Sequence, residues 1–332
     1  MKRRRPVHML AIVFGVVAAV PSIAAADTSF PAAAGDMTAR GNLLVWTPWT
    51  GPGRLMSGFG DAAPPLPIPR ARFGSVDLGT DARGRTVLVY KSCQAARPRH
   101  CAVYLYDFAS QRHRRLAALD RSGCRVGDVR ISRGTVAFAR DCGGRALDGL
   151  YLKRPGKPVR RIRGVPAEGG PIRRILGVPA VLSFDLDGNT VAFIHSQPRD
   201  GPEEATWWLT TEVRVLQLGQ RRSRLLARER QLVSPATSGA YVEDVRLDSR
   251  FAYWERQVFT EDFRQEILRR PIDASAPEAQ LERAGRLYVE PTAGDRLGSY
   301  AVSGDRLYYS RPAYVTGSEA FIAQVAGTPV FR

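Results

Sequence analysis

The sequence is poor in histidine and cysteine, and each shortage narrows the possible functions. Only four histidines and four cysteines occur among 332 residues, and no Cys-x-x-Cys pair is present. We therefore expect no zinc site of cysteine and histidine, no other metal site and no cofactor. A Gly-x-Ser-x-Gly motif is also absent, which argues against a prolyl-oligopeptidase-like peptidase.

Long apolar stretches are few as well. No apolar stripe with a period of 3.6 residues runs along the chain, so a helical fold is not expected. The apolar run Met9–Val20 follows the basic residues Lys2–Arg5 and precedes three alanines at 24–26. This order predicts a signal peptide cleaved before Asp27, hence a secreted protein, extracellular or periplasmic. An uncleaved anchor is the alternative, and no later run reaches the ~20 apolar residues of a transmembrane helix.

A hairpin pattern recurs along the rest of the chain. Each copy is a short strand, a turn with Gly, Asp or Ser, and a strand rich in Val, Phe, Tyr, Trp or Leu, which is typical of a β-hairpin. The best-defined copy has its turn at Asp187-Gly188-Asn189. The copies are residues 35–46, 75–90, 127–139, 183–194, 243–254 and 299–310.

A second pair of strands follows each hairpin, and the second strands of successive hairpins start roughly 44 to 60 residues apart. This spacing is typical of a four-stranded propeller blade. We predict an all-β fold, a single six-bladed β-propeller of four-stranded antiparallel blades over residues 27–332. The blades are expected to begin near residues 35, 75, 124, 181, 241 and 297. Residues 64–71 would be the outermost strand of the first blade, and residues 328–332 that of the last. Closure of the last blade by residues 27–34, as an added strand, is left open.

The repeats resemble the WD40-like propeller repeats of the TolB type. In those repeats an Asp-Gly turn precedes an apolar strand, and a strand ending in Arg-Leu closes the unit. The nearest copy is Asp187-Gly188 with the apolar residues 191–193, followed by residues 212–226. The resemblance covers residues 35–331 and implies propeller architecture. TolB carries an α/β domain before its propeller, whereas here about eight residues separate the cleavage point from the first repeat, so TolB's partners are not implied.

We label the strands of a blade a to d from the axis outward. The a–b turns are short, and the b–c connections are long, which places the elaborated loops on one face of the disc. The expected b–c loops are residues 47–53, 91–100, 140–148, 195–211, 255–264 and 311–318. Binding sites usually lie on the elaborated face of a scaffold.

Exposed aromatic and charged residues in these loops are the candidate contacts of a partner protein or a cell-envelope polymer. The candidates are Trp49, Arg97, His100, Glu203, Trp207, Trp208, Phe259, Phe263 and Tyr314. Trp207 and Trp208, beside Glu203, are the most unusual local feature. The alternative is that these rings fold back and are buried between blades.

The four cysteines allow three disulfide pairings. Export makes disulfides permissible. The register of the repeats favours Cys93–Cys101, which flank one b–c loop, and Cys124–Cys142, which lie at similar distances from one hairpin turn.

Basic residues outnumber acidic ones by 49 to 32, and most are arginine. Three basic clusters, at 112–115, 153–163 and 221–224, fall at or just before a proposed strand d. We interpret them as protection of exposed sheet edges. A rim that binds polyanions is the alternative, and we do not expect nucleic acid to be its ligand.

Two other readings of the sequence are weaker. Asp185-x-Asp187-Gly188-Asn189 resembles part of a calcium loop, but an EF-hand needs a Glu where Ile194 stands, which favours a plain turn. A glycosidase needs two facing carboxylates, and nothing pairs the acidic residues of the loops.

We therefore predict a secreted, monomeric, non-catalytic binding or scaffolding module that takes a protein on its b–c face. The alternatives are a carbohydrate-active enzyme of glycosidase or lyase type, and an arginine-rich polyanion-binding protein.

Overall fold

The structure is a computed structural model. It describes residues 28–31, 34–48, 53–58, 64–94, 97–119, 121, 123–142, 148–166, 181–202, 206–233, 239–259, 264–273, 282–283, 298–304, 306–313 and 317–324. The predicted signal peptide, residues 1–26, lies outside the described residues. Within the described part of the chain, no helix is long and apolar enough to cross a membrane.

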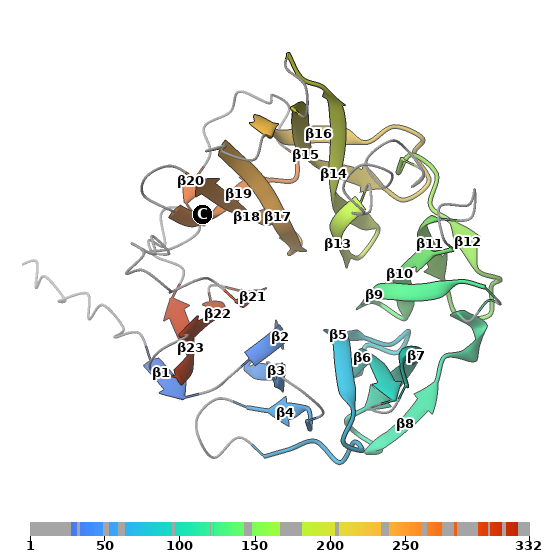
Figure 1. Cartoon of the computed structure of the whole chain (residues 1–332). Helices are drawn as coiled ribbons and strands as arrows, with labels where there is room; N and C mark the ends of the chain where they lie inside the picture. The colour runs from blue at the N-terminus through green and yellow to red at the C-terminus, as the bar shows by residue number, and fades with distance from the viewer. Residues whose placement is uncertain are drawn as a thin grey trace, which may run out of the picture.

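Antiparallel sheets stand like blades around a central axis (Figure 1). In chain order, and from the axis outward within each sheet, the first two sheets are β2 (Ala34–Arg40), β3 (Leu43–Pro48) and β4 (Met56–Ser57), then β5 (Arg72–Thr80), β6 (Thr86–Gln94), β7 (Arg97–Asp107) and β8 (Arg112–Arg115). The next two are β9 (Arg125–Ser132), β10 (Thr135–Asp141), β11 (Gly149–Lys153) and β12 (Arg160–Arg161), then β13 (Val181–Asp187), β14 (Thr190–Asp200), β15 (Trp207–Gln217) and β16 (Arg224–Val233). The last two are β17 (Gly239–Leu247), β18 (Phe251–Phe259), β19 (Arg264–Pro271) and β20 (Glu282–Arg283), then β21 (Ser299–Ser303), β22 (Arg306–Ala313), β23 (Gly317–Gln324) and β1 (Thr28–Pro31). A short 3-10 helix, Ala117–Leu119, follows β8.

The hairpins of strands a and b form where the sequence predicts them. The β13–β14 hairpin turns at Gly188, whose φ of 54° is readily adopted by glycine. Residues 191–194 of β14 are all buried because side chains on both faces of an inner strand pack against a neighbouring blade. The core therefore lies between sheets: Phe193 and Leu186 pack with Ala137 and Leu150 of the preceding blade.

The all-β class is confirmed, but the prediction of six four-stranded blades is wrong. Among the strands that the structure describes, five sheets are four-stranded blades, and the sheet β2–β3–β4 has three strands. The expected fourth strand, residues 64–71, makes only the isolated bridges Met56–Pro65 and Gly53–Ala71. Proline has no N–H to donate, so a segment with prolines at 64, 65, 67 and 69 cannot form a regular ladder. Leu66 is buried in this segment and still donates its N–H to the carbonyl of Leu55 at 2.8 Å.

The N-terminal strand completes the last sheet. β1 pairs antiparallel with β23, from Thr28 opposite Ile322 to Pro31 opposite Glu319. The first described strand thus occupies the outermost position of the blade that contains the last described strands. The segment expected there, residues 328–332, lies outside the described residues.

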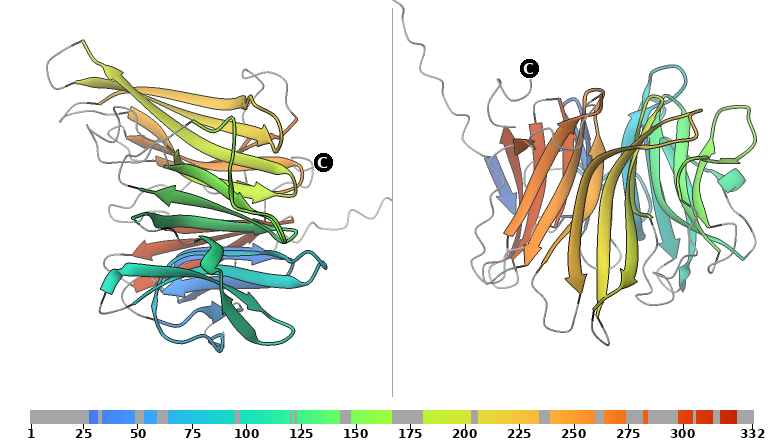
Figure 2. Two further views of the ribbon diagram at one scale, coloured as in Figure 1. Left: turned by 90° about the vertical axis from the view of Figure 1, so that its right-hand side faces the viewer. Right: turned by 90° about the horizontal axis from the view of Figure 1, so that it is seen from above.

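Most of the expected b–c loops are instead extensions of strands b and c. In the longest, predicted at 195–211, β14 continues to Asp200 and β15 begins at Trp207, with each residue from Thr190 to Asp200 paired. Pro198 lies within this extension and pairs with Leu209 in the ladder. The long strands of this sheet reach beyond those of its neighbours when the ring is seen from the side (Figure 2).

Both predicted disulfides are present. Cys93 bonds to Cys101 and Cys124 bonds to Cys142. Cys93 and Cys101 are direct partners on β6 and β7, and Cys124 and Cys142 lie just outside the ends of β9 and β10. The disulfides thus staple two hairpins at the end away from the a–b turns. Loop-closure entropy gives each a stabilisation of about 2.5–3.5 kcal/mol.

Candidate functional site

The innermost strands bring related residues to matching levels of the central channel. At the first level, aspartate and serine alternate from sheet to sheet. These residues are Asp36, Ser75, Asp128, Ser183, Asp244 and Ser299. A second level lies two residues further along each strand, so its side chains share the same face of the strand. It consists of Thr38, Asp77, Arg130, Asp185, Arg246 and Ala301.

The first level joins each blade to the next. An innermost strand has no strand partner on its inner edge, so its N–H groups need other acceptors. Side chains of the preceding blade supply them. The bonds are Val76 N–H to Asp36 Oδ2 (3.0 Å), Val129 N–H to Ser75 Oγ (3.2 Å), Val245 N–H to Ser183 Oγ (3.1 Å) and Met37 N–H to Ser299 Oγ (3.1 Å).

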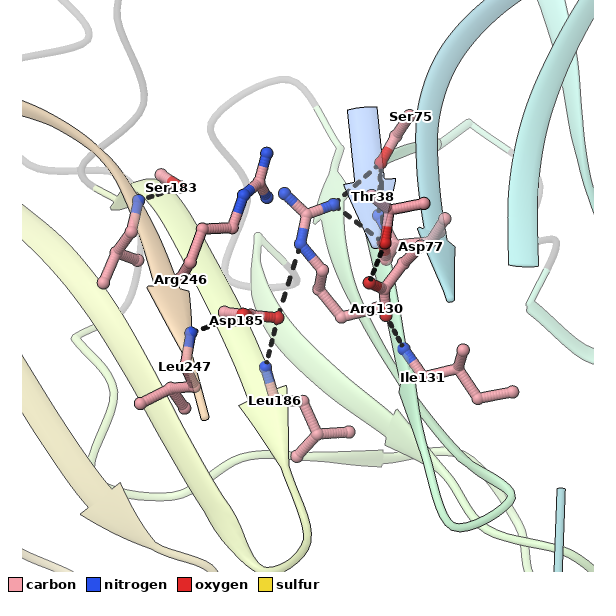
Figure 3. A network of polar contacts seen from close by, with 12 residues as sticks. Thr38, Ser75, Asp77, Arg130, Ile131, Ser183, Asp185, Leu186, Arg246 and Leu247 are labelled. Carbon is pink, nitrogen blue, oxygen red and sulfur yellow. Dashed lines mark hydrogen bonds and ion pairs between the residues drawn. The ribbon is translucent and has the colours of Figure 1, made fainter. Parts of the chain in front are cut away.

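The second level repeats this arrangement. Asp77 Oδ2 accepts the N–H of Ile131 at 2.6 Å, and Asp185 Oδ2 accepts the N–H of Leu247 at 2.7 Å (Figure 3). The Thr38 hydroxyl accepts the N–H of Leu78 in the same way, at 2.9 Å. These acidic and hydroxyl side chains therefore hold neighbouring blades together.

Two arginines interrupt the pattern because guanidinium groups only donate. Arg130 donates to Ser75 Oγ at 3.0 Å and to the carbonyl of Val129 at 2.9 Å, and its Nε lies 3.6 Å from Asp185. Arg130 is 3% exposed. Arg130 thus joins the blades through charge as well as hydrogen bonds.

Arg246 occupies the corresponding position two blades further on. Its Nη2 lies 3.0 Å from Asp244 and 3.4 Å from Asp36, and its Nε donates to the carbonyl of Tyr300 at 3.2 Å. Arg246 is 9% exposed. The guanidinium groups of Arg130 and Arg246 point toward one another inside the channel (Figure 3).

These arginines lie between the cavities at the two ends of the channel. A cavity of about 840 Å³ opens among the a–b turns and reaches Asp77, Asp185 and Arg246. A second cavity, of about 420 Å³, opens at the opposite end, where the innermost strands begin and the b–c hairpins rise. The larger cavity thus lies on the face expected to be plain. The smaller one is rich in carboxylates, from Asp36, Asp128, Glu243, Asp244 and Glu255.

Burial controls the protonation of the channel carboxyls. It raises the pKa of Asp77 to about 7, with a further increase from the nearby Asp185 charge, while Arg130 opposes both effects. Burial likewise raises the pKa values of Asp36 and Asp185 above their ordinary values. At neutral pH a substantial fraction of Asp77 therefore carries a proton.

Glu255 is one of the carboxyls of the acidic mouth whose pKa the surroundings shift. Burial and the adjacent charge of Glu243, its partner across the β17–β18 pair, raise the pKa of Glu255 to about 7. The side-chain amides of Gln257 and Gln265 donate to Glu255 Oε1 at 2.7 and 2.8 Å. Gln257 also donates to Glu243 Oε2 at 2.8 Å, so it bridges the two carboxyls.

The predicted contact residues are not gathered into one described site. Trp49, Glu203, Phe263 and Tyr314 lie outside the described residues. Arg97, His100, Trp207 and Phe259 lie on strands β7, β15 and β18, where only their backbone is described. Their strands all belong to b–c hairpins, so four of the candidates lie at the predicted end of the disc.

Trp208 is the one predicted contact whose side chain is described. It is half-buried near the start of β15, opposite Arg199 on one side and Leu232 on the other. The guanidinium carbon of Arg230 lies 4.3 Å from the centroid of the Trp208 ring, within cation–π range. Trp208 therefore belongs to a sheet surface rather than to a loop.

The Asp185–Asn189 segment ends strand β13 and turns at Gly188 and Asn189, and Asp185 accepts backbone N–H groups from Leu186 and Leu247. Across the described ranges, no group of three or more His, Cys, Asp or Glu residues could hold a metal ion.

The channel network is the feature that the sequence analysis missed. Its signal is present in the repeats themselves. When the six hairpins are aligned, one column reads Asp, Ser, Asp, Ser, Asp, Ser, and another contains Arg130 and Arg246 among aspartates. Polar residues in a column between buried apolar ones indicate a common environment, which here is the channel.

The fold places this protein in the β-propeller class. No protein-family model matches the sequence, and no curated protein matches it either.

Solved structures of similar shape include propellers and peptidases. The β-propeller domain of the Trilobed protease from Pyrococcus furiosus is 7% identical, with a TM-score of 0.43 over 88% of this chain and 95% of that chain. A puromycin-hydrolyzing peptidase of Mycobacterium tuberculosis is 12% identical, with a TM-score of 0.44 over 92% of this chain and 54% of that chain. A prolyl endopeptidase is 14% identical, with a TM-score of 0.41 over 89% of this chain and 40% of that chain. The chain thus spans only about half the length of the two peptidases. Because all three TM-scores are below 0.5, the propeller assignment rests on the strand order of the sheets.

Proposed function

We propose that this protein is an exported, non-catalytic binding module that takes a partner protein on the face carrying the b–c hairpins. The observation that carries the proposal is the paired β-structure of these hairpins around the 420 Å³ mouth of the channel. Paired strands form a firmer rim than loops, and binding to a preformed surface costs less ordering entropy. The TolB-like character of the repeats is part of this proposal.

The roles of the channel carboxyls support a binding module rather than an enzyme. Asp36, Asp77 and Asp185 each accept a backbone N–H from the next blade. A carboxyl committed to a backbone donor and shielded from solvent serves the assembly of the ring. Their raised pKa values follow from that burial.

The chemistry of the mouth favours a basic partner segment. Carboxylates collect there, although basic residues outnumber acidic ones in the chain as a whole. Asp128 and Glu243 line the mouth, and Glu243 is exposed. A lysine or arginine side chain entering the mouth would offset the repulsion between these charges.

Titration with a fluorescent hexalysine peptide, followed by anisotropy at low salt, tests the proposal. We expect Asp128→Asn and Glu243→Gln each to weaken binding by several-fold, and the double variant by about tenfold, or ~1.4 kcal/mol. Asp273→Asn, in the exposed turn after β19, removes the same charge elsewhere and should leave affinity unchanged. Equal weakening by Asp273→Asn would mean that the peptide senses net charge alone, and the proposal would fail.

Export has a separate test. The proposal requires that the cleaved chain, recovered outside the cytoplasm, begins at Asp27, which intact-mass spectrometry would show. Recovery of the chain with residues 1–26 still attached would contradict cleavage.

A further inference from the structure

β16 differs from the other outermost strands of the ring. It has ten residues, whereas β1 and β8 have four each and β12 and β20 have two each. Exposed edges are usually kept short because their unpaired N–H and C=O groups can pair with another chain. β16 therefore offers an edge more than twice as long as those of the other described blades.

The outer side of β16 is available for pairing as far as the described chain extends. β15 pairs with its inner side from Trp207–Val233 to Val215–Arg224, and no other described strand joins the sheet beyond β16. In a strand, alternate residues direct their N–H and C=O groups to opposite sides. About half of the backbone groups of β16 thus face away from β15.

Two arginines lie on one face of strand β16. Arg228 and Arg230 are two residues apart, so they project from the same face, and both are exposed. Arg228 pairs with Glu212 at 2.7 Å yet keeps 55% of its side chain exposed. Arg230 lies over the Trp208 ring. Contacts with β15 therefore hold both side chains in place while their outward sides stay open.

We propose that β16 binds an acidic, extended segment of a partner protein as an added β-strand. Main-chain hydrogen bonds along the edge would supply affinity, as in other cases of strand addition. Carboxylates at alternate positions of the added strand would lie opposite Arg228 and Arg230 and supply specificity. This surface is the rim of the disc, so the proposal does not depend on binding at the channel mouth.

The charge of these arginines favours an acidic partner strand over a second copy of the chain. A second copy of the chain pairing through β16 would bring Arg228 and Arg230 against the same residues, and like charges opposite one another destabilise a strand pair. An acidic strand has the complementary charge. The protein alone is therefore expected to remain monomeric.

Hydrogen–deuterium exchange with a synthetic decapeptide of alternating glutamate and valine tests strand addition. We expect the outward amides of β16 to exchange at least tenfold more slowly when the peptide is bound. A second decapeptide, with proline in place of each valine, carries the same charge but lacks half of the N–H donors. It should give no such protection. Equal protection by both peptides, or protection that spares β16, would overturn the proposal.

A pair of variants separates β16 from general attraction to a basic protein. Arg230→Glu should weaken binding of the glutamate–valine peptide at least tenfold. Arg114→Glu, on the short exposed strand β8, makes the same change of charge and should have little effect. Exchange in the buried strands reports folding of both variants. Equal weakening by the two variants, or a dimer formed through β16 in light scattering, would contradict acidic strand addition.

Discussion

At the scale of single residues, Asp185 combines several of the interactions that hold the ring together. Its carboxylate accepts the N–H groups of Leu186 at 2.8 Å and Leu247 at 2.7 Å and lies 3.6 Å from Nε of Arg130. Arg130 Nε has no hydrogen-bond partner, so this ion pair is its main compensation for burial. Loss of the carboxylate would leave the buried Arg130 cation without its ion pair and the N–H groups of Leu186 and Leu247 without their acceptor.

Asp185→Ala is therefore expected to lower the free energy of unfolding by about 3 kcal/mol, since breaking a buried pair leaves an uncompensated charge. Urea denaturation measures the change. Asp187→Ala, two residues along, serves as the comparison. The Asp187 carboxylate accepts a hydrogen bond from the Ser132 hydroxyl at 3.3 Å. We expect it to cost less than about 1 kcal/mol. Similar costs for the two variants would show that the channel contacts do not stabilise the ring.

Glu255 gives the protein a pH dependence of stability. Its folded pKa of about 7 lies above the ~4.3 of an unfolded glutamate, so the folded state binds the proton more tightly. Its contribution is present at low pH and is lost as the pH rises through the folded pKa. We expect Glu255→Gln, which cannot ionise, to lose less thermal stability than the wild type between pH 5 and about 8. Asp77, whose pKa is also raised, causes part of the decline in melting temperature in both proteins. An equal decline in the two would contradict the assignment to Glu255.

At the scale of elements, strand β5 shows how closely neighbouring blades approach. A Cβ placed on Gly79 would lie 2.1 Å from the carbonyl oxygen of Ile131 on β9, which is backbone and cannot move aside. A Cβ on Gly74, in the same strand, would meet only the flexible side chain of Lys91 at 3.4 Å. The two glycines thus offer a matched comparison within one element.

Gly79→Ala is expected to destabilise the protein by about 1–3 kcal/mol, the usual cost of overpacking. Gly74→Ala should have an effect within about 0.5 kcal/mol of zero. Chemical denaturation of both variants checks the contrast. Tolerance of alanine at position 79 would mean that β5 and β9 do not approach as closely as described.

The inner hairpins could be predicted from sequence because each is a local pattern of turn residues between apolar strands. The extended b–c hairpins could not, since Pro198 favours a loop by local propensity while the pairing of β14 with β15 keeps this part of the chain extended. The prediction of a fourth strand beside β4 was wrong for the opposite reason. Residues 64–71 have the apolar content of a strand, but their prolines remove the donors that a ladder needs.

The channel network escaped prediction because its bonds run between repeats. Asp77 and Ile131 are 54 residues apart, and no local pattern joins them.

The location of the arginine clusters was predicted correctly: all four residues of β8, Arg112–Arg115, are exposed on an outermost strand. The exceptional length of β16 could not be seen in sequence, since residues 224–233 alternate too weakly to mark a long strand.

At the scale of the whole molecule, the ring is closed by its first strand. β1 pairs with β23 at four successive residues, so the two ends of the described chain meet in one sheet. At about 0.2–1 kcal/mol for each cross-strand pair, this closure contributes roughly 1–4 kcal/mol. A chain lacking residues 27–31 is expected to unfold at lower urea concentration. Unchanged stability after this deletion would show that β1 does not fasten the ring.

The face used for binding is the central functional claim, and photo-crosslinking tests it most directly. A hexalysine peptide with one diazirine-bearing lysine is bound to the wild-type protein, irradiated, and its attachment points are mapped by mass spectrometry. We predict attachment at the acidic mouth, near Asp128, Glu243 and Glu255, where the b–c hairpins rise. Attachment among the a–b turns at the 840 Å³ cavity, near Asp187 and Asp248, would contradict the account.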